Sequence, residues 1–535
     1  IATLLAGGDV IDSNSDGDLD DGRLLAGVVT GVSGGSTVLD GANEIGRLGS
    51  FRAGFGSLGG GGNLVVNDVT GGLVVDGADV SGLGQTGAAA KGSIDLATEL
   101  GDLATEGLGT LTAGSDIDLT SQGAEGDTSG SDITLGASVT AAAGTLTLTS
   151  AGEVTQSAAG VITADVLTGT SVDHTDLFAA NNKIRELASY ATGAAFSGAT
   201  FRLRDSDLGL LISGPVTSLG GAIEIKAEGG GSLLVAGTVS SRPTSASASS
   251  GGIDLWSAGT VEIAASLLSN DGAVTVRSGG TAVQTISDAS GTFTSVTVPV
   301  GIYLNGGSIE TRSGAVSLMA ENGGGIYLDG DVDTAVPEFV GLDGVAGNVT
   351  LTAGNVIAQA MDRKIVAADL TADTQAYGAG GTVEVTAGGG YDGKLVLGDS
   401  QVAGDYILTV LDGLDPDLVV DGVTIAGLIE VARDFIVNGT IDITQTADGK
   451  TLVGGIDLPG LLADILDGDG TFNALPTVSG TQDFDVSVAA VAAALEKAGL
   501  SVPELTALLW SEELKVGNQK LGPAILLNGS GNRVD

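Results

Sequence analysis

The chain has 535 residues, and 66 Asp and Glu against 21 Lys and Arg give it a net charge of −45. Because basic patches are missing, this charge excludes nucleic acid and anionic membrane surfaces as partners. A hydrophobic fraction of 42% excludes an acidic disordered tail, the absence of Cys excludes disulfides and thiol nucleophiles, and no apolar run is long enough to span a membrane.

The first distinctive segment in chain order is an acidic loop near residues 12–22. Its oxygen-bearing side chains follow the spacing of a calcium loop, and Gly17 permits the sharp bend that such a loop needs. Position 12 of the pattern is Arg23, where a bidentate carboxylate belongs, so the match is incomplete. A solvated Asp/Gly/Ser turn is the alternative. The predicted calcium ligands are Asp12, Asn14, Asp16, Asp18 and Asp20.

A short strand phrase, Gly-x-V/I/L-x-V/I/L-x-small, recurs along most of the chain. Each copy alternates apolar and polar residues and is opened by a turn residue, which predicts a β-strand. One such strand cannot bury its apolar face alone, but many can if they stack into a solenoid. The copies begin at Gly92, Gly144, Gly221, Gly252, Gly272, Gly314, Gly347 and Gly381.

A longer repeat encloses these strands. Asn43–Phe51 matches Asn182–Tyr190 at an offset of 139 residues (182 − 43), and Leu73–Gly77 matches Leu210–Gly214. The matched stretches keep their apolar positions and change their polar ones, which indicates a shared inward face and a free outward face. Aligning the stretch before Asn43 with its second copy leaves about six extra residues in the acidic loop, so we expect that loop to point outward.

Two later segments interrupt the pattern. Residues 240–252 are rich in Ser and Gly and predict a second outward loop. After residue 457, short helices are predicted over 458–466, 486–498 and 501–510, the last opened by a capping box at Ser501. We therefore expect a β-helix body over residues 1–456 and a small mixed α/β cap or docking region over residues 457–535.

The strands and the Gly-x-Val/Ile-x-Gln links between them resemble the filamentous-haemagglutinin-like exoproteins of Gram-negative bacteria. The resemblance covers residues 8–400 and rests on phrases such as Gly347-Asn-Val-Thr-Leu-Thr-Ala and Gly354-Asn-Val-Ile-Ala-Gln. It implies a right-handed parallel β-helix that is secreted and displayed at, or shed from, the cell surface. Members of that family serve as adhesins, matrix fibres or carriers of toxin tips.

Catalysis has little support in the sequence. His174 is the only histidine, so Ser-His and Cys-His nucleophile systems are nearly excluded, and we expect His174 to be an exposed loop residue. The sequence therefore predicts a structural or adhesive extracellular protein, not an enzyme, which assembles head-to-tail into surface or matrix fibres. Other cell surfaces and matrix polysaccharide are further expected partners. The alternatives are a calcium-assembled surface-layer protein and, less favoured, a β-helix polysaccharide-degrading enzyme with a carboxylate pair.

Overall fold

The computed structural model describes residues 1–410 apart from gaps, and beyond residue 410 it describes only the backbone of short strands. The gaps are residues 13–21, 56–60, 78–86, 124–130, 194–197, 245–247, 287–295, 336–345, 361, 378–380, 389–394, 399 and 405. Within the described residues every regular element is a β-strand, and neighbouring strands are mostly parallel. The prediction of an all-β chain that forms a parallel β-helix is confirmed.

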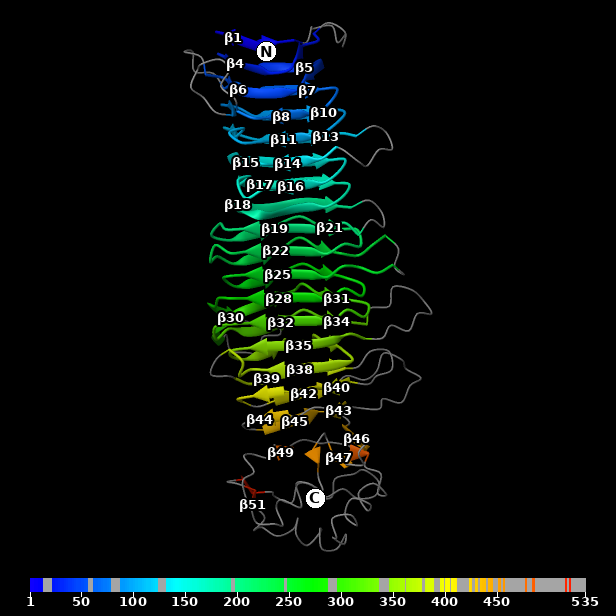
Figure 1. Ribbon diagram of the computed structural model, residues 1–535. Coiled ribbons are helices and arrows are strands. Elements are labelled where there is room, and N and C mark those ends of the chain that lie inside the picture. Colours follow the sequence, from blue (N-terminus) through cyan, green and yellow to red (C-terminus); the bar gives the residue numbers. More distant parts are fainter. Residues whose placement is uncertain are drawn as a thin grey trace. The chain divides into compact units, whose positions relative to one another are not determined.

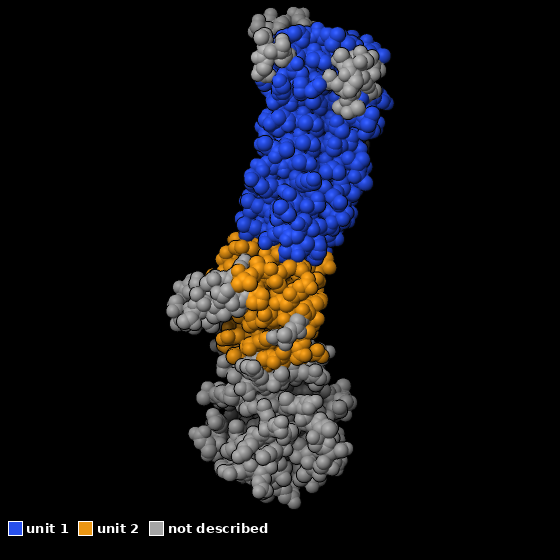
Figure 2. All heavy atoms as spheres, turned by 90° about the vertical axis from the view of Figure 1, so that its left-hand side faces the viewer, with its two compact units in different colours: residues 1–259 blue, residues 260–535 orange. Residues whose placement is uncertain are grey.

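The chain divides into two compact units, residues 1–259 and residues 260–535, which Figure 2 shows in blue and orange. In each unit the chain winds in coils, and every coil adds strands to a set of parallel sheets (Figure 1). The strands of the first unit are β1 (Ala2–Ala6), β2 (Val10–Ile11), β3 (Leu25–Ala26), β4 (Val29–Ser33), β5 (Thr37–Ile45), β6 (Arg47–Ala53), β7 (Leu64–Asp68), β8 (Leu73–Val75), β9 (Ala88–Ala90), β10 (Ile94–Thr98), β11 (Leu103–Thr105), β12 (Leu111–Ala113), β13 (Ile117–Ser121), β14 (Ile133–Leu135), β15 (Val139–Ser150), β16 (Val154–Gln156), β17 (Ile162–Ser171), β18 (Thr175–Thr192), β19 (Phe201–Asp205), β20 (Leu210–Ile212), β21 (Val216–Ser218), β22 (Ile223–Ala227), β23 (Leu233–Val235), β24 (Val239–Ser240) and β25 (Ile253–Ser257).

Three columns of parallel strands run through the middle of the first unit. One column contains β7, β10, β13 and the second half of β15, and another contains β8, β11, β14 and β16. The third contains β9, β12 and the first part of β15, which turns the corner between two columns. The register stacks aliphatic residues of successive coils on one another. Ile94 pairs with Ile117, which pairs with Leu146, and all three side chains are fully buried. These inward stacks form the core.

The last residue of the strand phrase is small, and where it is serine its hydroxyl has a structural role. It lies inward at a corner of the coil, where the turn leaves backbone carbonyl groups that need a hydrogen-bond donor. The buried hydroxyl of Ser150 donates to the carbonyl oxygens of Ser131 and Glu153, each at 2.9 Å. The opening glycine is required by close approach, because a Cβ atom on Gly144 would lie 2.3 Å from the carbonyl oxygen of Ser115.

The long internal repeat is confirmed by matching contacts. Gly31 of β4 pairs with Phe51 of β6, and Gly169 of β17 pairs in the same way with Tyr190 of β18. A Cβ atom on either glycine would lie 2.2 Å from a backbone oxygen of the neighbouring coil and 3.0 Å from the aromatic ring. Both rings are buried, so each copy packs an aromatic ring against a glycine of the preceding coil. This agrees with the sequence match between the copies.

The second unit has the same parallel organisation. Its β28, β32, β35 and β38 pair in succession, and β30, β33, β36 and β39 form a second column. Its strands are β26 (Val261–Ile263), β27 (Leu267–Leu268), β28 (Val274–Ser278), β29 (Ala282–Ile286), β30 (Val296–Asn305), β31 (Ile309–Glu310), β32 (Val316–Ala320), β33 (Gly325–Asp329), β34 (Val332–Asp333), β35 (Asn348–Ala353), β36 (Ile357–Gln359), β37 (Ile365–Val366), β38 (Asp369–Asp373), β39 (Val383–Gly388), β40 (Leu395–Leu397), β41 (Ser400–Val402), β42 (Tyr406–Val410), β43 (Val423–Ile425), β44 (Ile429–Val431), β45 (Asp434–Asn438), β46 (Ile441–Gln445), β47 (Thr451–Val453), β48 (Ile456–Asp457), β49 (Thr477–Val478), β50 (Phe484–Asp485), β51 (Lys515–Val516) and β52 (Gln519–Lys520).

The predicted helices at 458–466, 486–498 and 501–510 lie outside the described residues. The boundary at residue 457 and the cap stay predictions. The predicted loop over residues 240–252 falls between β24 and β25, and its described part beyond Ser240 contains no strand.

Candidate metal centre

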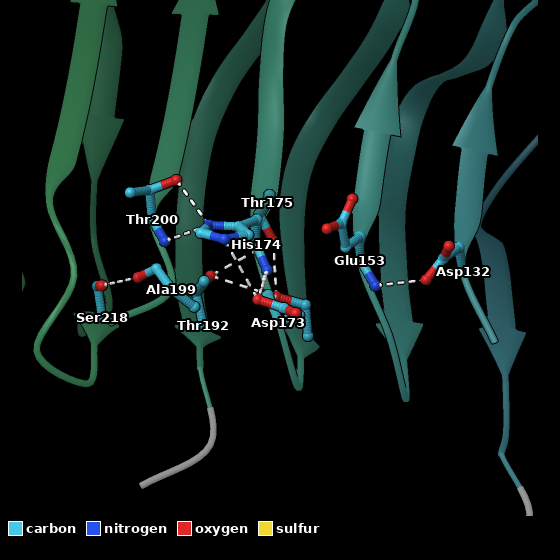
Figure 3. Close-up of polar contacts among 10 residues, drawn as sticks. Asp132, Glu153, Asp173, His174, Thr175, Thr192, Ala199, Thr200 and Ser218 are labelled. Carbon is cyan, nitrogen blue, oxygen red and sulfur yellow. Dashed lines mark hydrogen bonds and ion pairs between the residues drawn. The ribbon is translucent and has the colours of Figure 1, made fainter. Parts of the chain in front are cut away.

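One group of side chains in the described part of the chain has the composition of a metal site. Ligand atoms of Glu153, Asp173 and His174 all lie within 4.8 Å of one another. Glu153 directly precedes β16, and the other two precede β18, so adjacent coils bring them together (Figure 3). Carboxylates and imidazole are ligands that zinc accepts. The geometry of the imidazole decides whether the group can act as a metal site.

The imidazole of His174 is already committed to the backbone. Its Nδ1 accepts the backbone N–H of Thr200 at 2.9 Å and lies 3.0 Å from the hydroxyl oxygen of the same residue (Figure 3). An Nδ1 atom that accepts a hydrogen bond carries no proton, so the neutral ring holds its proton on Nε2. Nε2 lies 3.4 Å from Oδ1 of Asp173, close enough for an electrostatic interaction with that carboxylate.

This arrangement opposes metal binding at either nitrogen. A metal ion on Nε2 would require the proton to move to Nδ1, where it would face the N–H of Thr200. A metal ion on Nδ1 would have to displace that N–H. In both cases a backbone donor loses its acceptor. The three side chains thus form a polar cluster whose histidine is used structurally.

Aspartate accepts a backbone N–H in the same way two and three coils earlier. Oδ1 of Asp102 accepts the backbone N–H of Asp132 at 3.0 Å, and Oδ1 of Asp132 accepts that of Glu153 at 2.8 Å. Each of these residues stands immediately before a strand of the same column, as His174 does. At Asp102, Asp132 and His174, a side-chain acceptor receives the amide of the equivalent residue in the next coil. His174 has the same role in this column, as the acceptor for the N–H of Thr200.

The other copy of the long repeat contains no counterpart of the cluster. At the position of His174 it has Ser36, whose hydroxyl accepts the backbone N–H of Asn63 at 3.2 Å. Asn63 in turn is the counterpart of Thr200. The hydrogen bond is retained while the histidine is not, which is the behaviour of a structural acceptor. The prediction of an exposed loop position for His174 agrees with its half-exposed side chain, but the sequence did not indicate this bond.

A second polar network lies inside the same corner. The hydroxyl of Ser171 donates to the carbonyl oxygen of Asp173 at 2.7 Å and lies 2.8 Å from the hydroxyl of Thr175. The hydroxyl of Thr192 donates to that of Thr175 at 3.3 Å (Figure 3). These hydroxyl groups are buried and bonded to one another, so they are corner donors and acceptors and not activated nucleophiles.

A buried amide lies at the centre of each copy of the repeat. Oδ1 of Asn182 accepts the N–H of Ile162 at 3.0 Å and the side-chain N–H of Gln156 at 2.6 Å. Its Nδ2 donates to the carbonyl oxygens of Leu177 and Arg204, each at 3.0 Å. The side chain therefore satisfies backbone groups of three successive coils at once.

The first copy uses Asp12 where the second uses Gln156. There, Oδ1 of Asn43 accepts the N–H of Leu24 at 2.8 Å, and its Nδ2 donates to Oδ2 of Asp12 at 2.7 Å. The carboxylate that begins the predicted calcium loop is thus part of a repeated structural network.

The predicted calcium ligands are described only in part. Oδ1 of Asp12 accepts the N–H of Asp40 at 3.0 Å, so both oxygens of this carboxylate are hydrogen-bonded within the chain. Asn14, Asp16, Asp18 and Asp20 lie outside the described residues. Asp12 and Gly22, which flank them, lie against each other, as an insertion requires. Calcium binding stays a prediction.

Two buried carboxylates were not singled out by the sequence patterns. Oδ1 of Asp205 accepts the N–H of Ile184 at 2.8 Å, and Oδ1 of Asp68 accepts that of Ile45 at 2.7 Å in the other copy. Both side chains are fully buried, and burial raises the pKa of Asp205 to about 7 and that of Asp68 to about 6. Their equivalent positions in the repeat could have identified them as a pair.

The outward faces of the first unit also carry ion pairs. The Arg202 guanidinium lies between Asp176 and Glu224, at 3.1 and 2.9 Å, and 4.4 Å from the centre of the Phe178 ring. These charges come from three successive coils, and Lys226, which pairs with Glu224 at 2.8 Å, is the second cation that balances the two carboxylates. The patch is a ladder between coils and presents no free anion-binding group of its own.

No protein-family model, curated protein or solved structure matches the chain. Within the described residues, no helix is long and apolar enough to cross a membrane.

Proposed function

We propose that the chain is a structural or adhesive extracellular protein of the filamentous-haemagglutinin-like kind, displayed at or shed from the surface of a Gram-negative bacterium. In this role the β-helix is a scaffold that carries variable outward side chains on inward positions whose contacts are retained. It works by presenting a large, acidic, water-facing surface to other cells or to matrix polysaccharide. Head-to-tail assembly into fibres is part of the proposal.

The observation that carries the proposal is the comparison between the two copies of the repeat. Buried positions keep their contacts, as the glycine–aromatic pairs and the buried asparagines show. Outward positions change freely: Arg47 forms an ion pair with Asp76, whereas its counterpart Glu186 accepts a hydrogen bond from Ser213. The two copies therefore retain the packing of the β-helix core and differ in the side chains of its outer surface.

The polar cluster at His174 supports the same function. The one histidine of the chain accepts a backbone amide, and the corner hydroxyl groups bond to one another. Polar groups that resemble a site are thereby explained by coil-to-coil hydrogen bonding.

Antibody labelling of intact and lysed cells tests the location. We expect intact cells of the source bacterium to bind an antibody raised against residues 1–259, and brief surface proteolysis to remove the signal. A signal that appears only after lysis would contradict an extracellular role.

A further inference from the structure

Two cations of the first unit lie against one aromatic ring on the outside of the coils. The guanidinium carbon of Arg52 in β6 lies 3.7 Å from the centre of the Phe55 ring, and Nζ of Lys91, directly after β9, lies 5.4 Å from that centre. Strands β6 and β9 pair in parallel, so neighbouring coils contribute the two cations. Lys91 is exposed and the other two residues are partly exposed, so all three can meet a ligand from the solvent. We call these three residues the cationic cluster.

The two cations differ from arginines that the first unit uses to join its coils. Arg47, for example, pairs with Asp76 at 2.8 Å, and the charges of such a pair balance each other. Neither Arg52 nor Lys91 forms an ion pair with any of the described residues. Their positive charge is therefore available to a ligand.

The surroundings of the cationic cluster supply no carboxylate either. Val32 and Ala89 pair with Arg52 from the coils before and after it, and both are uncharged. Residues 56–63, which follow Phe55, contain no Asp or Glu in the sequence. In a chain with 66 acidic and 21 basic residues, the cluster is thus a local positive charge on an acidic surface.

The second copy of the repeat has the same backbone without these cations. Ala191 stands in the place of Arg52, and Leu219 stands in the place of Lys91. The N–H of Leu219 donates to a carbonyl group of β18 at 3.1 Å, as the N–H of Lys91 donates to one of β6 at 3.2 Å. The fold therefore requires neither cation, and the cluster is a feature of the first copy.

The chemistry of the cationic cluster favours a carboxylate that is attached to a carbon ring. A guanidinium that stacks on an aromatic ring still presents N–H groups at its edge, and these bind a carboxylate through two parallel hydrogen bonds. The ammonium group of Lys91 adds a second positive charge, and the edge of the Phe55 ring offers an apolar contact to the C–H groups of a sugar.

The charge of the whole chain limits the kind of polymer that can bind. A net charge of −45 repels a densely charged polyanion, whereas two cations suffice for one isolated carboxylate. A polysaccharide whose acidic sugars are separated by neutral ones meets both conditions.

We propose that the cationic cluster binds the carboxylate of a uronic acid in a polysaccharide whose acidic and neutral sugars alternate. This inference rests on the proposed function and names the class of sugar that its polysaccharide partner carries. Arg52 binds the carboxylate, Lys91 adds the second charge, and Phe55 holds both cations in place and contacts the sugar ring.

Surface plasmon resonance of the full chain over immobilised hyaluronan, in which glucuronic acid alternates with a neutral sugar, tests the proposal. We expect saturable binding that weakens as the salt concentration rises. Hyaluronan whose carboxyl groups have been reduced to alcohols should not bind, because it offers the same sugars without the charge.

Three variants test the individual residues. Arg52→Ala should raise the Kd at least about tenfold, because it removes hydrogen bonds to a charged group. Lys91→Leu should raise the Kd about threefold, as expected for an exposed ion pair, and Phe55→Leu should have an effect of about the same size. Arg52→Ala and Lys91→Leu introduce the residues of the second copy, so the melting temperature should stay unchanged.

Lys183→Ala is the matched control. Lys183 is exposed on β18 and lies outside the cationic cluster, so this change removes one positive charge from the chain and leaves the cluster intact. It should bind hyaluronan as the wild type does.

The proposal is overturned if the wild type does not bind hyaluronan, if the carboxyl-reduced polymer binds equally well, or if Arg52→Ala binds no more weakly than Lys183→Ala. Equal or tighter binding of polyglutamate would assign the cluster to acidic peptides and reject the sugar. A chain that labels intact cells but does not bind would reject this inference and leave the proposed function standing. Binding by a chain found only inside cells would do the reverse.

Discussion

At the residue scale, the chain uses whichever side chain presents an acceptor at a given corner. Asp102, Asp132 and His174 receive the amide of the next coil in one column, and Ser36 does so in the other copy. This position requires a side-chain atom that can accept a hydrogen bond from the backbone N–H of the next coil. A carboxylate, an imidazole or a hydroxyl group can supply that atom. A solitary histidine near two carboxylates is therefore explained without a reaction or a metal.

The first prediction concerns that histidine. His174→Asn should leave the free energy of unfolding nearly unchanged, because Oδ1 of asparagine can take the place of Nδ1 as acceptor for the N–H of Thr200. His174→Ala removes the acceptor and should cost about 1 kcal/mol. Urea unfolding of both variants measures the difference. Zinc should not raise the melting temperature, and a zinc effect lost in His174→Asn would show that the cluster is a metal site after all.

At the residue scale, the sequence predicted which side chains face inward, but it did not predict their hydrogen-bond partners. The alternation around Gly144 predicts which residues face inward, because the period of a strand is two. It gives no reason why Ser150 should bond two carbonyl groups, since that depends on how the chain turns the corner. The hydrogen bond of His174 depends on residue 200, which only the stacking of coils brings near.

At the element scale, the repeated unit is a set of coils with a buried polar centre. Asn182 in one copy and Asn43 in the other satisfy backbone groups where a long strand turns between columns. Polar side chains in such places cost stability if left unpaired, so both copies retain the amide. The sequence match around these residues predicted the repeat, but their burial was visible only in the fold.

The next prediction concerns the buried carboxylates of these elements. The pKa of Asp205 is raised to about 7 and that of Asp68 to about 6, whereas an unfolded aspartate titrates near about 3.9. The folded chain therefore holds protons that the unfolded chain releases. This contribution to stability is fully present below about pH 4 and is lost as the pH rises through about 6 and 7.

Thermal unfolding between pH 4 and pH 8 measures this contribution. Asp205→Asn, an uncharged mimic of the protonated residue, should show a smaller fall in melting temperature with rising pH than the wild type. Asp40→Asn, at an exposed carboxylate, is the matched control and should follow the wild-type curve, because it corrects for the repulsion common to all acidic groups. Identical pH profiles for Asp205→Asn and Asp40→Asn would refute the assignment.

At the scale of the whole molecule, composition and periodicity predicted the fold class and the inward positions. They did so because a β-helix repeats one alternation of inward apolar and outward polar residues in strand after strand. A pattern that recurs this often can be recognised in the sequence. The candidate sites were less predictable. Four of the five predicted calcium ligands lie outside the described residues, and the cluster at His174 arises from coil stacking, which no local pattern encodes.

The central claim is that the β-helix is an extracellular scaffold that assembles through its own coils. Electron micrographs of native material, labelled with gold-conjugated antibody to residues 1–259, test this claim most directly. The account predicts gold on extracellular fibres or on the cell surface. Gold confined to dispersed particles in the cell interior would contradict it.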